Sequence, residues 1–229
     1  MTFPHPKGVF FDWDGTLADS FSFLEAAHND VLKSFDKPPF EQGGFKHYFG
    51  KPREEIYPAL YGEKNAAEAQ ARFEVFVQKN HTTMLKRING AEEVLKTLSD
   101  MGMIMGVVSN KKPEFVNAEI NHFEWRKYFS SVVGAKEAEN DKPSPDPIIL
   151  GVQRASLEPN MGNIWYVGDT KIDFLASNAA QCPVIIIGSE VQDADIRNAE
   201  VPAKKFETLA EFNDFLLQYA QNEIQQKKA

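Results

Sequence analysis

Two aspartates, Asp12 and Asp14, follow an apolar run of strand length that begins at Val9. Burying a carboxylate is costly unless another group compensates for its charge, so two of them at the end of a buried strand need partners. Alternate residues of a strand point to the same side, which places both carboxylates together. Gly15 ends the run, and the turn that it forms with Thr16 can present backbone N–H groups to an anion. The stretch therefore predicts an acidic site beside an anion-binding turn.

Three later apolar segments also lead into polar residues. One is followed by Ser109 and Asn110, one by Lys142 and one by Asp169. The carboxyl ends of parallel strands meet at one edge of an open α/β sheet, where ligands bind. Carboxylates gathered there suit Mg²⁺, which takes oxygen ligands, and a carboxylate such as Asp12 can also attack phosphorus. The metal and the lysine would neutralise the repulsion between carboxylate and phosphate. The set therefore predicts phosphoryl chemistry.

After a first strand near the start of the chain, strand-like and helix-like patterns alternate from Gly90 onwards. The expected strands cover residues 9–12, 103–110, 130–134, 163–170 and 183–188. The expected helices cover residues 91–102, 113–123, 144–156, 171–180 and 208–224. Apolar strands that alternate with helices indicate a parallel sheet with helices on both faces. We therefore predict an α/β fold with a Rossmann-like parallel sheet core.

A purely helical stretch interrupts this pattern after the first strand. Helical spacing covers residues 20–35, 50–60 and 64–85, and a loop rich in Pro and Gly follows the first of these segments. We predict a small helical cap domain at residues 19–87, inserted into a catalytic core of residues 1–18 and 88–229.

The composition narrows the classes of partner. The chain has 229 residues and a formal net charge of −8, which disfavours nonspecific binding to nucleic acid or to an anionic membrane. Cys182 is its single cysteine, consistent with a reducing compartment. We find neither the pattern of a signal peptide nor an apolar run long enough to span a membrane. We expect a cytoplasmic protein that binds a small molecule, and the sequence does not indicate its oligomeric state.

Four motifs resemble, in the expected order, those of the haloacid dehalogenase-like hydrolase superfamily. They are DWDGT at residues 12–16, VVSNK at 107–111, DKPSPDP at 141–147 and GDTKID at 168–173. The resemblance covers essentially the whole chain. It is greatest to the phosphoglycolate-phosphatase-like group, in which a helical cap follows the first motif. It implies a phosphoric monoester hydrolase that uses Mg²⁺ to cleave a small phosphorylated metabolite through an aspartyl-phosphate.

The resemblance also implies a role for each matching residue. Asp12 matches the nucleophile, which is also a metal ligand. Asp14 matches the general acid/base, whose backbone carbonyl contributes to the metal site. Ser109 matches the hydroxyl that binds phosphate, and Lys142 the lysine that holds nucleophile and phosphate. The remaining matches are Gly15 and Thr16 at the phosphate, Asn110 as a neighbouring phosphate contact, Asp169 as the second carboxylate of the metal site and Asp173 as a supporting acid.

Two positions bear on a sugar-phosphate mutase of the β-phosphoglucomutase type, which competes with the phosphatase interpretation. Arg53 resembles the arginine that this branch presents to a distal phosphate, so it is a candidate phosphate-binding residue, although a solvated arginine at a helix start is the plainer interpretation. Leu24 occupies the place, ten residues after Asp14, where the mutase branch tends to carry a histidine. Leucine there favours hydrolysis.

The motifs also argue against three further functions. Dehalogenase and phosphonatase branches lack the second aspartate of the first motif, which is present here as Asp14. All four motifs are intact, which disfavours a non-catalytic phosphate-binding or interaction protein. Of the neighbouring residues, Trp13 is expected to pack in the core, whereas Lys111 is as consistent with a solvated side chain as with a role in the site. The cap residues that contact the leaving group stay open among Arg53, Lys51, His47 and Tyr48.

Overall fold

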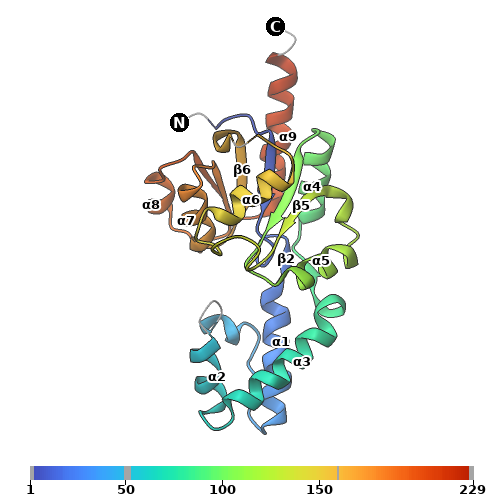
Figure 1. Cartoon of the computed structure of the whole chain (residues 1–229), viewed down its shortest axis with the longest axis vertical. Helices are drawn as coiled ribbons and strands as arrows, with labels where there is room; N and C mark the ends of the chain where they lie inside the picture. The colour runs from blue at the N-terminus through green and yellow to red at the C-terminus, as the bar shows by residue number, and fades with distance from the viewer. Residues whose placement is uncertain (1–2, 49–52, 159, 227–229) are drawn as a thin grey trace. The chain divides into compact units, whose positions relative to one another are not determined.

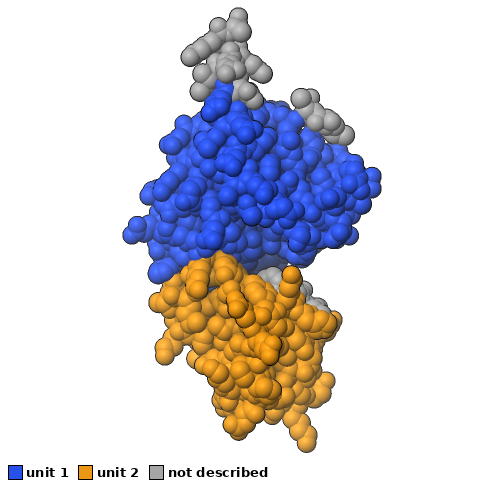
Figure 2. All heavy atoms as spheres, turned by 180° about the vertical axis from the view of Figure 1, so that it is seen from behind, with its two compact units in different colours: residues 1–18, 87–229 blue, residues 19–86 orange. Residues whose placement is uncertain are grey.

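The computed structural model describes residues 3–48, 53–158 and 160–226. It divides the chain into two compact units, shown in different colours in Figure 2. Unit 1 comprises residues 1–18 and 87–229, and unit 2 comprises residues 19–86. Among the described helices, none is both long and apolar enough to cross a membrane.

Unit 1 is built on a six-stranded sheet (Figure 1). Its strands are β1 (Gly8–Phe11), β4 (Ile104–Val108), β5 (Phe129–Val133), β6 (Ile164–Gly168), β7 (Val184–Ile187) and β8 (Ala203–Phe206). They lie in the order β5-β4-β1-β6-β7-β8, and every neighbouring pair is parallel. The chain builds the sheet outward from β1 to β5 and then returns to place β6 on the other side of β1. This reversal is the position at which open α/β sheets bind ligands.

Helices pack on both faces of this sheet. They are α4 (Ala91–Asp100), α5 (Pro113–His122), α6 (Asp146–Arg154), α7 (Lys171–Ala179), α8 (Asp193–Arg197) and α9 (Leu209–Gln226), with short 3₁₀ helices η2 (Arg126–Tyr128) and η3 (Met161–Asn163). On one face, Phe10 and Tyr166 share a buried cluster with Ile148 of α6. On the other, α9 brings Phe215 against Trp165. The predicted α/β class with a Rossmann-like parallel sheet is confirmed.

The polar residues at the expected strand ends follow the strands rather than belong to them. Asp12 comes directly after β1, Ser109 directly after β4 and Asp169 directly after β6. The predicted strands were therefore one or two residues too long at these ends. The strand β8 was missed, because its central residues Lys204 and Lys205 do not form an apolar run.

Unit 2 is helical. It contains α1 (Ser20–Ser34), η1 (Gly44–His47), α2 (Arg53–Tyr61) and α3 (Ala66–Met84), and residues 50–52 of the predicted second helix lie outside the described residues. Asp19 caps α1 by accepting a hydrogen bond from the N–H of Ser22 at 3.1 Å. A two-stranded sheet pairs β2 (Ala18–Asp19) with β3 (Lys86–Arg87) where the chain enters and leaves this unit.

An aromatic cluster surrounds a buried histidine in unit 2. The ring of His28 lies 4.4 Å from that of Phe73 and 4.6 Å from that of Phe45, measured between centroids. Its Nδ1 lies 2.9 Å from Tyr61 Oη. Burial lowers the pKa of His28 to about 4, so the ring is neutral at physiological pH. Phe73 therefore belongs to the buried core of this unit.

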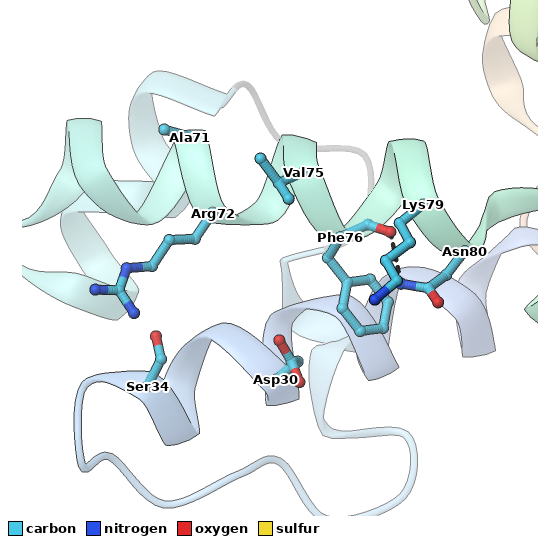
Figure 3. Close-up of a pocket in the computed structure, with 8 residues that line it drawn as sticks. All are labelled: Asp30, Ser34, Ala71, Arg72, Val75, Phe76, Lys79 and Asn80. Atoms are coloured by element: carbon cyan, nitrogen blue, oxygen red, sulfur yellow. Dashed lines mark hydrogen bonds between the residues drawn. The ribbon is translucent and has the colours of Figure 1, made fainter.

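A hollow lies between α1 and α3 on the surface of unit 2 (Figure 3). Its labelled lining includes Asp30 and Ser34 from α1 and Arg72, Phe76 and Lys79 from α3. No residue predicted for the chemistry lines it, and we assign it no role in catalysis.

A substitution at Gly168 tests the close packing between the end of β6 and the start of α7. A Cβ at this position would lie 2.4 Å from both Cβ and Cγ of Asp173, which cannot move without shifting the start of the helix. We predict that Gly168→Ala destabilises the protein by about 1–3 kcal/mol and lowers Tm by roughly 2–10 °C. Gly162→Ala is the control, because its Cβ would meet Asn160 Oδ1 at an ordinary 3.6 Å. Equal melting temperatures of the two variants in calorimetry would contradict this packing.

Candidate active site

Asp12 and Lys142 form a buried ion pair at the end of β1. The side chain of Asp12 is 10% exposed and that of Lys142 is 3% exposed, and Lys142 Nζ donates a hydrogen bond of 2.7 Å to Asp12 Oδ1. The backbone N–H of Asp12 donates to Val167 O at 2.8 Å, which continues the pairing of β1 with β6 for one more residue. The carboxylate is therefore held by both backbone and side-chain contacts.

The ammonium group of Lys142 makes three hydrogen bonds. Besides Asp12, it donates to Asp173 Oδ1 at 2.7 Å and to Tyr166 Oη at 2.8 Å. An ammonium group has three protons, so these bonds satisfy it. Burial alone would lower the pKa of Lys142, but the carboxylates of Asp12 and Asp173 outweigh it and raise the pKa well above its usual value. The lysine therefore carries its charge at neutral pH.

Asp173 connects this lysine to the start of α7. Its Oδ2 accepts hydrogen bonds from Thr170 Oγ1 at 2.6 Å and from Thr170 N at 3.1 Å, in a reciprocal cap of the helix. Burial would raise the pKa of Asp173, but the contacts with Lys142 and Thr170 lower it below its usual value. Asp173 thus stays ionised and orients Lys142 from the helix terminus.

Asn110 holds the backbone of Lys142. Its Nδ2 donates to Lys142 O at 2.8 Å, and its Oδ1 accepts from Lys142 N at 3.0 Å. The sequence had indicated only that Asn110 adjoins the phosphate. Its neighbour Ser109 is buried at the end of β4 and accepts a hydrogen bond on Oγ from Lys111 N at 3.2 Å.

Asp14 belongs to a second group of charges. Lys111 Nζ donates to Asp14 Oδ1 at 2.7 Å and to Glu119 Oε2 at 2.8 Å, and Trp13 Nε1 donates to the same Glu119 oxygen at 2.7 Å. Trp13 is buried as expected. Lys111, whose role the sequence left open, donates hydrogen bonds to both of these acids. Burial would lower the pKa of Lys111, but Asp14 and Glu119 raise it.

Glu119 and Tyr166 were missed by the sequence analysis. Glu119 occupies a buried position of α5 between Val116 and Ile120, and an acid at an otherwise apolar helix position was a readable signal. Tyr166 gave no such signal, since a tyrosine within the apolar run before Asp169 is consistent with plain packing.

Asp169 lies against the turn after the first motif. Thr16 Oγ1 donates to Asp169 Oδ1 at 2.8 Å. Gly15 has a positive φ of 85°, and a Cβ there would lie 2.2 Å from Asp169 Oδ2. Both the backbone conformation and the close approach of the carboxylate therefore require glycine at this position.

Three carboxylates gather where a cation would balance their charge. Oxygens of Asp12, Asp169 and Asp173 all lie within 4.8 Å of one another. Burial raises the pKa of Asp12 to about 7, and Asp173 and Asp14 add to the effect against the opposing influence of Lys142. Burial and the charges of Asp12 and Asp173 raise the pKa of Asp169 to about 8. An all-oxygen, acid-rich set of this kind fits Mg²⁺.

Arg53 lies in unit 2, at the start of α2. It pairs on the surface with Glu74 of α3, with 3.2 Å between Arg53 Nη1 and Glu74 Oε1 and both side chains more than half exposed. Of the other open candidates, His47 ends η1, Tyr48 follows it, and Lys51 lies outside the described residues. The structure thus gathers the predicted residues of unit 1 and leaves Arg53 in a separate surface pair.

The raised pKa values predict how stability depends on pH when divalent cations are removed. Asp12 and Asp169 hold protons in the folded state that the unfolded chain releases above about pH 4, so stability falls as pH rises towards about 8. Asparagine at position 169 cannot ionise and can still accept the bond from Thr16. We predict that in EDTA the melting temperature of Asp169→Asn rises relative to that of the unmutated protein as pH increases, so that the difference between the two is at least about 3 °C larger at about pH 8.5 than at about pH 5.

The control for this experiment is Asp100→Asn, at an exposed aspartate that ends α4. This variant should melt like the unmutated protein at both pH values. Calorimetric curves for Asp169→Asn that run parallel to those of the unmutated protein across the range would show that Asp169 is not held protonated.

The sequence of this chain matches a known protein family. A family model described as haloacid dehalogenase-like hydrolase matches residues 9–187, a range that contains all four motifs. Phosphoglycolate phosphatase 1 of Pseudomonas aeruginosa is 29% identical over 194 residues, which cover 80% of this chain and 70% of that protein.

Solved structures share the fold. A HAD-superfamily hydrolase from Ehrlichia chaffeensis has a TM-score of 0.64 at 24% identity and covers 95% of this chain and 98% of its own. A Thermotoga maritima protein, which its name assigns provisionally to beta-phosphoglucomutase, has a TM-score of 0.77 at 20% identity over 93% of this chain and 99% of its own. At these identities the likeness concerns the fold alone. The chain belongs to the haloacid dehalogenase-like hydrolases, which confirms the predicted family and, with the curated relative, the predicted enzyme class, a phosphatase.

Proposed function

We propose that this protein is a Mg²⁺-dependent phosphatase that hydrolyses a small phosphomonoester, of the phosphoglycolate type, through an aspartyl-phosphate on Asp12. The observation that carries the proposal is the buried Asp12–Lys142 pair beside Asp169, at the edge where β1 and β6 end. The name of the Pseudomonas aeruginosa relative supports the substrate class. The net charge of −8 supports a small-molecule substrate rather than nucleic acid.

In the first step, a carboxylate oxygen of Asp12 attacks phosphorus and the bond from phosphorus to the ester oxygen breaks. Asp14 gives its proton to the departing oxygen, so that an alcohol leaves. The ammonium group of Lys142 is hydrogen-bonded to Asp12, and its positive charge reduces the repulsion between the Asp12 carboxylate and the phosphate oxygens. Ser109 and the backbone N–H groups of the Gly15 turn would bind those oxygens.

In the second step, Asp14 is a carboxylate and takes a proton from water. The water oxygen attacks phosphorus, the bond to Asp12 breaks, and inorganic phosphate leaves. Both residues return to their initial protonation states. Asp173 keeps Lys142 in place through both steps, because its charge is fixed by Thr170 and the lysine itself.

Asp12, Asp169 and the backbone carbonyl of Asp14 would hold the Mg²⁺. When bound, the ion would supply positive charge that stabilises the transferring phosphoryl group. The raised pKa values of Asp12 and Asp169 support this assignment, because a divalent cation favours the ionised form of both carboxyl groups.

We also propose that the predicted insert, residues 19–87, is a cap domain for the core of residues 1–18 and 88–229. A cap would exclude water during attack and release product on opening, with hinges at residues 16–20 and 87–90. Arg53 is our candidate for binding an anionic group of the substrate. Its exposed pair with Glu74 is of a weak kind, so the guanidinium can exchange partners at little cost.

Asp12→Asn tests the nucleophile. Phosphate release from p-nitrophenyl phosphate and from phosphoglycolate should fall by at least about a thousandfold, because an amide does not attack phosphorus. Asp100→Asn should retain full activity, and EDTA should silence the unmutated protein until Mg²⁺ is restored. Circular dichroism checks that Asp12→Asn keeps its fold. Substantial turnover by this variant, or equal turnover without metal, would exclude the mechanism.

The product formed from a hexose 1-phosphate separates hydrolase from mutase. Leu24 packs against the buried cluster of unit 2 and has no group that could move a proton, so nothing at this position restrains attack by water. We predict that incubation with a hexose 1-phosphate releases inorganic phosphate and gives no 6-phosphate isomer by ³¹P NMR. Accumulation of the 6-phosphate would favour the mutase.

A further inference from the structure

A buried carboxylate on α5 has no part in the two chemical steps of the proposed hydrolysis. The side chain of Glu119 is 0% exposed, and the same oxygen, Oε2, accepts from Trp13 Nε1 at 2.7 Å and from Lys111 Nζ at 2.8 Å. Burial raises the pKa of Glu119 above its usual value, so this position costs free energy. An apolar residue would suit the same helix face, where Val116 and Ile120 are buried.

The contacts of Glu119 lead back to the first motif by two routes. One is direct, through the indole N–H of Trp13. The other passes through Lys111, whose Nζ also donates to Asp14 Oδ1 at 2.7 Å. Because Trp13 and Asp14 are adjacent in the chain, these bonds and the peptide link close a ring. The ring holds both the backbone and the carboxylate of Asp14 against α5.

We propose that Lys111 and Glu119 are positioning residues that orient the carboxyl group of Asp14 for proton transfer. Glu119 fixes Lys111 from the buried side, and Lys111 fixes Asp14 Oδ1 at the edge of the site. The inference rests on the proposed function, in which Asp14 protonates the departing oxygen as the bond to phosphorus breaks and the electron pair stays on that oxygen.

This role predicts a dependence on the leaving group. A phenolate ion is basic and needs the proton from Asp14, whereas p-nitrophenolate is a stable anion that leaves without it. The two aryl phosphates differ by one nitro group and share the same phosphate group and ester oxygen. The value of kcat/KM reports the steps up to cleavage of the ester bond, so hydrolysis of the phosphoenzyme, which is common to both substrates, does not affect it.

The test compares Lys111→Met and the double variant Lys111→Met/Glu119→Gln with the unmutated protein. The single variant leaves a carboxylate buried without its ammonium partner and is expected to be less stable. The double variant replaces both charges and keeps the shape, which avoids that penalty. For both, kcat/KM for phenyl phosphate should fall by about tenfold to a hundredfold, while kcat/KM for p-nitrophenyl phosphate should change by less than about threefold.

Two exposed residues provide matched controls. Lys96→Met removes a lysine of α4 that pairs with Glu92 on the surface, and Glu114→Gln neutralises an exposed acid at the start of α5. Both should leave the ratio of the two kcat/KM values unchanged. An equal loss on both substrates in the double variant would show that Lys111 and Glu119 serve stability alone and would overturn the inference. If the unmutated protein hydrolyses neither ester, the proposed function fails, and this inference with it.

Discussion

The ammonium group of Lys142 neutralises two buried carboxylates of the site, Asp12 and Asp173. It is buried, and its three hydrogen bonds reach Asp12 after β1, Tyr166 within β6 and Asp173 in the first turn of α7. A buried ammonium is tolerated only when each of its protons has a partner, and a buried carboxylate needs a cation in the same way. These groups therefore stabilise one another, and removing any one of them leaves at least one buried polar atom without its partner. The parallel pairing of β1 with β6 brings them together.

Asp169 lies next to this group, but the charge of Lys142 does not neutralise it. Lys142 serves Asp12 and Asp173, but Asp169 keeps a pKa near 8 because burial and two neighbouring carboxylates oppose its ionisation. Gly15 lets the turn of the first motif approach this carboxylate, and Thr16 donates to it. The fold thus holds these carboxyl groups close together at a cost in stability, which a divalent cation bound between them would offset. Strongly shifted pKa values of this kind are characteristic of functional sites.

Asp14 is held by a separate set of contacts. Lys111 pairs with Asp14 and with Glu119 of α5, whereas Lys142 pairs with Asp12 and with Asp173 of α7. Two acids that are two residues apart therefore have independent charge partners. In the proposed mechanism, this separation lets Asp14 exchange a proton without disturbing the charge partners of the proposed nucleophile Asp12, which is how neighbouring acids acquire different roles.

Much of this arrangement was readable from the residue order. Apolar runs that end in Asp12, Ser109 and Asp169, with helices between the later runs, predicted parallel strands with polar ends, because apolar patterning is a local and repetitive feature of the sequence. The fold class followed, as did the meeting of these residues at one edge.

The partners of each charge depended on tertiary structure. Tyr166 reads as a packing position and Asn110 as a phosphate neighbour, and the acid at Glu119 indicates only that it needs a partner, not which one. A contact between residues that are far apart in the chain leaves no periodic trace. The sequence thus determined which groups stand at the strand ends, and packing of α5 and α7 against the sheet decided which ammonium neutralises which carboxylate.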